Sequence, residues 1–70
     1  MKNEYVYYCP ERPPELGSVP KTGLLYVECF RERKYVPEAG CKVWGWAVYK
    51  KRLTPEDILD YELIEKVQEG

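Results

Sequence analysis

The chain lacks the residues and patterns on which most catalysis depends. It contains no histidine, the usual base beside a nucleophilic cysteine. Its five glycines are scattered, so no glycine-rich phosphate-binding loop is present. The carboxylates between residues 56 and 65 follow a helix start, where a solvated charged face accounts for them. No nucleophile-and-base arrangement is evident, and we expect a protein that is not an enzyme and uses no cofactor.

Cysteine is scarce and odd in number. Cys9, Cys29 and Cys41 cannot all pair within one chain, and their wide spacing lacks the close pairs of structural zinc sites. We therefore expect free thiols and no metal. No apolar run approaches the roughly 20 residues that span a bilayer, and the N-terminus lacks the apolar stretch of a signal peptide. These features predict a cytoplasmic protein without a membrane partner.

Length and charge set further limits. Seventy residues predict one small domain, residues 1–70, whose folding buries only about 60–65% of the unfolded surface. The 11 basic and 12 acidic side chains nearly balance, so a generally basic nucleic-acid binder is not indicated. Aromatic residues are plentiful, with seven tyrosines and two tryptophans, and they supply large apolar area to a thin core.

The order of residue types predicts mostly β structure. Residues 4–8 are aromatic and β-branched, as a short strand requires. Residues 10–23 hold four of the six prolines and predict a long loop. Residues 24–35 and 41–51 then form a central hairpin around the turn at 36–40, which carries proline early and glycine late. We expect an α+β fold, with a three- or four-stranded antiparallel sheet and one short helix.

That helix is predicted in the C-terminal half, over residues 54–60. Thr54 is a good N-cap, Pro55 suits the first helical position, and the acidic pair at 56–57 favours the positive end of the helix dipole. Further along, the apolar residues spread around most of a helical wheel. We therefore favour a helix that ends at Asp60 and is followed by an extended segment. One helix reaching about Gln68 is the alternative.

The segment with two tryptophans has two different faces if it is a strand. Trp44, Trp46 and Val48 share the bulky face. The other face has Gly45 and Ala47 at its middle, so that something else can approach the backbone closely there. We expect the tryptophans to form the core, because a small domain needs their volume. Alternatively, the helix packs on Gly45 and Ala47, and the tryptophans form an outward platform.

Two basic runs lie near these aromatic residues, at 31–34 and 49–52. With a turn at 37–40, Arg33 is expected opposite Trp44 and Arg31 opposite Trp46. An aromatic sheet with basic rims is one way to bind single-stranded nucleic acid. Charges that keep an edge strand soluble explain the same runs.

The run from Gly40 onward, with a segment before it, carries a resemblance that covers about 50 of the 70 residues. Gly40-Cys41, Trp44-Gly45 and the Leu53-to-Glu56 segment, preceded by Val19-Pro20 and Gly23, resemble motifs of small uncharacterised proteins of Firmicutes phages and integrative mobile elements. The resemblance implies a mobile-element accessory protein, and a short helix followed by an extended segment. It implies no activity and no site.

The most consistent functional prediction is a small adaptor or inhibitor that binds another protein, or a second copy of itself. Tyrosine and tryptophan are favoured as interface anchors, and the proline-rich loop is presented at low entropic cost. The expected binding residues are mostly aromatic, with two arginines at the rim: Tyr5, Tyr7, Tyr26, Trp44, Trp46, Tyr49, Arg31 and Arg33. Single-stranded nucleic-acid binding is the alternative.

Overall fold

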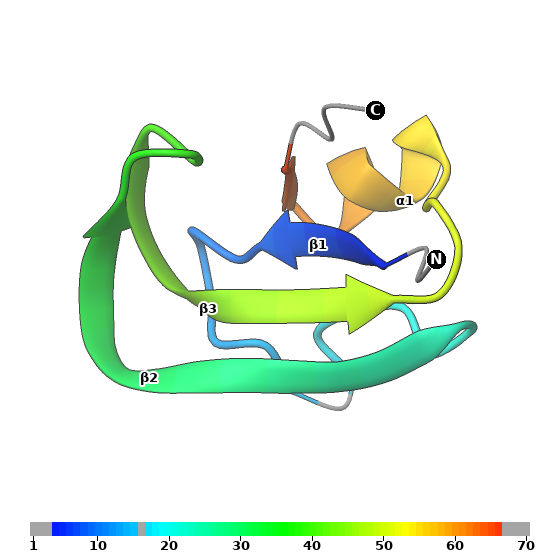
Figure 1. Ribbon diagram of the computed structural model, residues 1–70, viewed down its shortest axis with the longest axis horizontal. Coiled ribbons are helices and arrows are strands. Elements are labelled where there is room, and N and C mark those ends of the chain that lie inside the picture. Colours follow the sequence, from blue (N-terminus) through cyan, green and yellow to red (C-terminus); the bar gives the residue numbers. More distant parts are fainter. Residues whose placement is uncertain (1–3, 16, 67–70) are drawn as a thin grey trace.

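One four-stranded antiparallel sheet, with strand order β2-β3-β1-β4, carries a single short helix (Figure 1). The structure is a computed structural model that describes residues 4–15 and 17–66. The predicted α+β class is confirmed. The elements are β1 (Tyr5–Tyr8), β2 (Leu24–Val36), β3 (Cys41–Tyr49), α1 (Pro55–Asp60) and β4 (Ile64–Glu65).

Local chemistry fixes both ends of α1. The Thr54 hydroxyl accepts a hydrogen bond from the Asp57 N–H at 3.2 Å, as an N-cap does. After Asp60 the chain turns through Glu62, which has a φ of 54°, and enters β4. The short helix is therefore confirmed, and a helix continuing through residues 61–66 is wrong. Residues 67–70 lie outside the described residues. No helix in the described ranges is long and apolar enough to cross a membrane.

The central hairpin turns where the sequence predicts, but its register is irregular. Between the pairs Cys29–Gly45 and Lys34–Val43, the four β2 residues 30–33 stand against Trp44 alone. Glu28 consequently lies opposite Trp46, so the predicted pairing of Arg31 with Trp46 is wrong, while the irregular segment gives Trp44 no single paired residue on β2. Extra residues on one strand bend it. In Figure 1, β2 bends and the turn end of the hairpin rises out of the plane of the sheet.

Gly45 permits the close contact between β2 and β3. A Cβ atom at this position would lie 2.0 Å from the Glu28 carbonyl oxygen, and the φ of Gly45 is 154°. No other residue type fits that space without a shift of one backbone. The close approach expected at the small residues of β3 thus occurs at Gly45, where the approaching group is the Glu28 carbonyl of the neighbouring strand.

The core lies on the face of β3 that carries Ala47 and Tyr49. These two residues are fully buried, together with Tyr7 of β1, and α1 packs its Ile58 against the cluster. The expectation that the tryptophans form this core is wrong, because both are half-buried and belong to the opposite face of β3. Two tyrosines supply the volume instead, and each satisfies its hydroxyl by a hydrogen bond.

The loop at residues 10–23 covers part of this core. Its Pro14 and Val19 are buried, and the Tyr49 hydroxyl donates a hydrogen bond to the Pro20 carbonyl oxygen at 2.5 Å. The Ser18 hydroxyl donates to the Pro13 carbonyl oxygen at 2.9 Å and accepts from the Glu15 N–H at 2.8 Å. The loop is consequently tied to the sheet and to itself.

Candidate functional site

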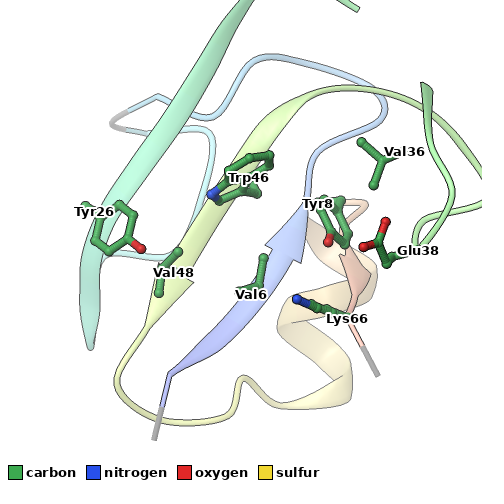
Figure 2. A pocket seen from close by; sticks show the side chains of 8 residues that line it. All are labelled: Val6, Tyr8, Tyr26, Val36, Glu38, Trp46, Val48 and Lys66. Atoms are coloured by element: carbon green, nitrogen blue, oxygen red, sulfur yellow. The ribbon is translucent and has the colours of Figure 1, made fainter. Parts of the chain in front are cut away.

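The face of the sheet opposite the core contains an open hollow of about 320 Å³ (Figure 2). Strands β1, β2 and β3, the hairpin turn and the residue after β4 all contribute to its lining. The lining residues are Val6, Tyr8, Tyr26, Val36, Glu38, Trp46, Val48 and Lys66. We call this feature the aromatic hollow.

Strand pairing places the floor of the aromatic hollow. Val48 of β3 lies between Val6 of β1 and Tyr26 of β2, because it is paired with both. Trp46 is paired with Tyr8 one step along the same face. The bend of β2 brings Val36 and Glu38 to this face from the hairpin turn. The hollow thus depends on the irregular segment of the hairpin.

Aromatic rings meet edge to face across the three strands. The Trp46 ring centroid lies 6.1 Å from that of Tyr8 and 5.3 Å from that of Phe30, with interplanar angles of 86° and 85°. The Lys34 Nζ stands 5.1 Å from the centroid of the Phe30 ring, within cation–π range. Such packing holds Trp46 in a fixed orientation, as a recognition surface requires.

The aromatic residues that line the hollow differ in their exposure to solvent. Tyr8 is only 4% exposed, whereas Tyr26 is 52% exposed. In Figure 2 the Tyr8 ring lies beside Glu38, while Tyr26 stands at the far side of Trp46. Tyr26 is therefore the more accessible aromatic ring of the lining, and Trp46 is half-buried.

Two charged side chains line one part of the hollow, which is otherwise apolar. Burial raises the pKa of Tyr8, and the nearby negative charge of Glu38 raises it further. Lys66 brings a positive charge to the same region. The arrangement suits an apolar or aromatic side chain whose neighbouring polar groups reach Glu38 and Lys66.

The aromatic residues predicted to bind are divided between the two faces. Tyr26 and Trp46 line the hollow, and Trp44 is half-buried on β3 outside that lining. Tyr7 and Tyr49 have no exposed surface, so the structure removes them from any contact surface. Tyr5 is half-buried and packs against the same core. Arg31 and Arg33 are exposed on the irregular segment of β2.

Sequence reasoning missed several lining residues for a physical reason. Val6 and Tyr8 were available from strand alternation, since they share the face that Tyr5 and Tyr7 do not. Glu38 and Lys66 carried no local signal, because only the bent hairpin and the placement of β4 bring them to this face.

The three thiols lie at different depths. Cys9 is buried, Cys41 is half-buried and Cys29 is exposed, and all three are free. Burial raises the pKa of Cys9 to about 12. Within residues 4–15 and 17–66, no three cysteine or carboxylate side chains are placed to hold a metal ion.

The model of the family described as "Defence against restriction A C-terminal" matches residues 2–67. No curated protein and no solved structure matches the chain.

Proposed function

Since that match covers nearly all of its length, the chain belongs to the "Defence against restriction A C-terminal" family, and we propose that it is a non-catalytic interaction module acting in defence against restriction. The family is associated with phages and mobile elements, in agreement with the general kind that the sequence resemblance implies. We also propose that the protein originates from a Firmicutes element and that it is located in the cytoplasm. Three free cysteines support the cytoplasmic location.

The proposed partner is another protein, bound at the aromatic hollow. The observation that carries this proposal is the open hollow itself, where Trp46 and the half-exposed Tyr26 lie beside an apolar floor on the face away from the core. Aromatic side chains of this kind are enriched among the residues that dominate binding energy at protein interfaces. A protein segment that inserts one apolar side chain fits the size and lining of the hollow.

Strand β2 supports the same proposal, because it is an edge of the sheet. Its Leu25 and Val27 are exposed, although both are apolar. An edge strand with exposed apolar side chains favours pairing with an extended segment of another chain. Tyr26 lies between these two residues and lines the hollow, so one extended segment can use both features.

A photo-reactive phenylalanine at position 26 tests the proposed binding surface. Tyr35 is the matched control, since it is also a tyrosine of β2, is 63% exposed and lies outside the hollow lining. In cells that contain the restriction system, we expect a cross-linked protein from position 26 and little from position 35. Equal cross-linking from both positions contradicts recognition at the hollow.

A plating assay tests the role in defence. Cells that restrict unmodified phage DNA are supplied with the wild-type protein, Tyr26→Ala or Tyr35→Ala. We expect wild type and Tyr35→Ala to raise plating efficiency, and Tyr26→Ala to lose much of that effect. No protection by the wild type contradicts the role in defence. Full protection by Tyr26→Ala contradicts the role of the hollow.

Single-stranded nucleic acid on the aromatic face is a second candidate. Lys34 stands over the Phe30 ring, and Arg31 and Arg33 are exposed on the same irregular segment. Bases stack on such aromatic surfaces, while cations contact the phosphates. Binding that weakens steeply with salt and that requires Arg31 and Arg33 would favour this candidate over a protein partner.

A further inference from the structure

A separate cleft of about 500 Å³ lies at the end of the sheet away from the hairpin turn. Its walls are the turn after the proline-rich loop and the segment that joins β3 to α1. The lining residues are Pro20, Lys21, Thr22, Lys51, Arg52, Leu53, Thr54, Asp57 and Tyr61. We call it the lysine cleft. It shares no lining residue with the aromatic hollow.

The turn at Gly23 brings lysines from two parts of the chain together. A Cβ atom on Gly23 would lie 3.3 Å from Lys51 Cγ and 3.7 Å from Lys50 Cγ, so both lysine stems run against this glycine. The Lys50 N–H also donates to the Gly23 carbonyl oxygen at 2.9 Å. Lys21 lies two residues before Gly23 and lines the cleft with Lys51.

Core contacts fix the loop wall of the cleft. Tyr49, which is fully buried, holds the Pro20 carbonyl oxygen by its hydroxyl, and Val19 is buried beside it. The Leu24 N–H closes the turn by donating to the Lys21 carbonyl oxygen at 3.1 Å. The backbone under Lys21 is therefore anchored to the core and is in place before any ligand arrives.

The charge of the cleft is positive, although the whole chain carries a formal charge of −1. In the described part of the chain, Lys21, Lys50 and Lys51 have no ion-pair partner. Arg52 is paired with Glu65 at 2.9 Å, so it adds little net charge. Asp57 is the one carboxylate in the lining. Two lysines of the lining, Lys21 and Lys51, thus stand with one carboxylate, and Lys50 adds a third positive charge beside the cleft.

The lining also offers neutral donors. The Thr54 oxygen accepts from the Asp57 N–H, which leaves the Thr54 hydroxyl hydrogen free to donate. Thr22 supplies a second hydroxyl, and the half-buried Tyr61 supplies a ring against which a sugar or base can pack. Ammonium groups and hydroxyls together are the donors that contact phosphate oxygens in nucleic-acid complexes.

We propose that the lysine cleft binds the phosphodiester backbone of a nucleic-acid strand. Successive phosphates match several separated lysine charges, and the strength of such binding comes from release of counterions. This site goes beyond the protein-binding role of the hollow and does not depend on it. One protein can then hold nucleic acid at one end of the sheet and a protein partner on the face opposite the core.

Fluorescence anisotropy with a short labelled DNA, single-stranded and duplex, tests the proposal at low salt. The cleft variant is Lys21→Gln with Lys51→Gln. The matched control is Arg12→Gln with Lys42→Gln, which removes two exposed positive charges outside both the cleft lining and the aromatic hollow. We expect the cleft variant to bind at least about tenfold more weakly and the control to change little. The slope of log K against log salt should fall by about 1 for each lysine removed.

Several outcomes overturn the proposal. Absence of binding by the wild type at low salt does so, as does an equal loss in the cleft variant and the control. Two further probes are vesicles that contain phosphatidylserine and, separately, inorganic phosphate in solution. Binding of the protein to either probe without binding to DNA rejects a nucleic-acid ligand. The charge-conserving variant Lys21→Arg with Lys51→Arg should retain binding. Loss of binding in this folded variant also contradicts the proposal, because Arg contacts phosphate as well as Lys does.

Discussion

Tyr7 meets Tyr49 edge to face inside the core, with ring centroids 5.7 Å apart and an interplanar angle of 78°. Each hydroxyl reaches a different part of the chain. The Tyr7 hydroxyl accepts from the Leu53 N–H at 2.9 Å and donates to the Glu65 carboxylate at 3.0 Å, whereas the Tyr49 hydroxyl donates to the Pro20 carbonyl oxygen. The pair therefore links three parts of the chain to the centre of the sheet: the segment before α1, strand β4 and the proline-rich loop.

Removal of the Tyr7 hydroxyl should weaken the fold. Tyr7→Phe leaves the Leu53 N–H without its acceptor, and an unsatisfied buried donor costs about 1–3 kcal/mol. Tyr49→Phe loses one hydrogen bond to Pro20 and should cost less. Urea unfolding of both variants measures the two losses in free energy of unfolding. A larger loss for Tyr49→Phe would contradict the linking role given to Tyr7.

Gly45→Ala should be among the most damaging small substitutions. The added Cβ would meet the Glu28 carbonyl oxygen at 2.0 Å, so β2 and β3 must separate. Gly40→Ala is the control, because Gly40 has a φ of 74° and no atom within 4 Å of the added Cβ. It should cost about 1–2 kcal/mol from backbone strain alone, and Gly45→Ala clearly more. Thermal melting compares them, and equal shifts would argue against close backbone contact.

The thiols should react in order of their exposure. At mildly alkaline pH we expect an alkylating reagent to modify Cys29 first, Cys41 more slowly, and Cys9 only after unfolding. Burial protects Cys9 and raises its pKa to about 12, so little thiolate forms there. Mass spectrometry of digests taken over time measures each site. Modification of Cys9 at the rate of Cys29 in folded protein would place Cys9 outside the core.

Glu65 should contribute stability that acid removes. The Arg52 hydrogen bond, assisted by that of Tyr7, lowers the pKa of Glu65 from its ordinary value of 4.5. A carboxylate whose pKa is lower in the folded state stabilises the fold at pH above the ordinary value, and this contribution is lost as pH falls through the folded value.

The variant Glu65→Gln removes this titration. Its stability should consequently be lower than that of the wild type at neutral pH, and the gap should narrow as pH falls below about 4.5. Chemical unfolding at a series of pH values measures the gap. A gap that stays constant with pH would show that the Arg52–Glu65 pair contributes no pH-dependent stability.

The chain order of the elements was predictable because each begins or ends at a residue with a strong local preference. Pro10 to Gly23 cannot form a central strand, Pro37 and Gly40 mark a turn, and Thr54 starts a helix. These preferences act over a few residues and do not depend on the rest of the molecule. The structure accordingly follows them within one or two residues.

The two faces of the sheet were harder to predict. Volume alone favoured the tryptophans as the core, but Tyr7 and Tyr49 fill it because partners for both hydroxyls come from distant segments. The hollow depends on the irregular segment of β2, residues 30–33. Neither the sequence of that segment nor the presence of Gly45 predicts how many residues of β2 lack a regular partner on β3. Two of the eight predicted binding residues, Tyr26 and Trp46, line the hollow, because they lie on the face of the sheet away from the core.

The strand order has a consequence for how the protein is made. Strand β4 is paired with β1 alone, and the Glu65 carboxylate that Tyr7 contacts lies 58 residues away in the chain. The hairpin of β2 and β3 is local and can form early, but β1 gains its second neighbour only when residues 64–65 are available. Contacts between such distant residues slow folding. Strand β4 therefore completes the sheet by pairing with β1, the first strand of the chain. A chain that stops at Asp60 would leave one edge of β1 unpaired.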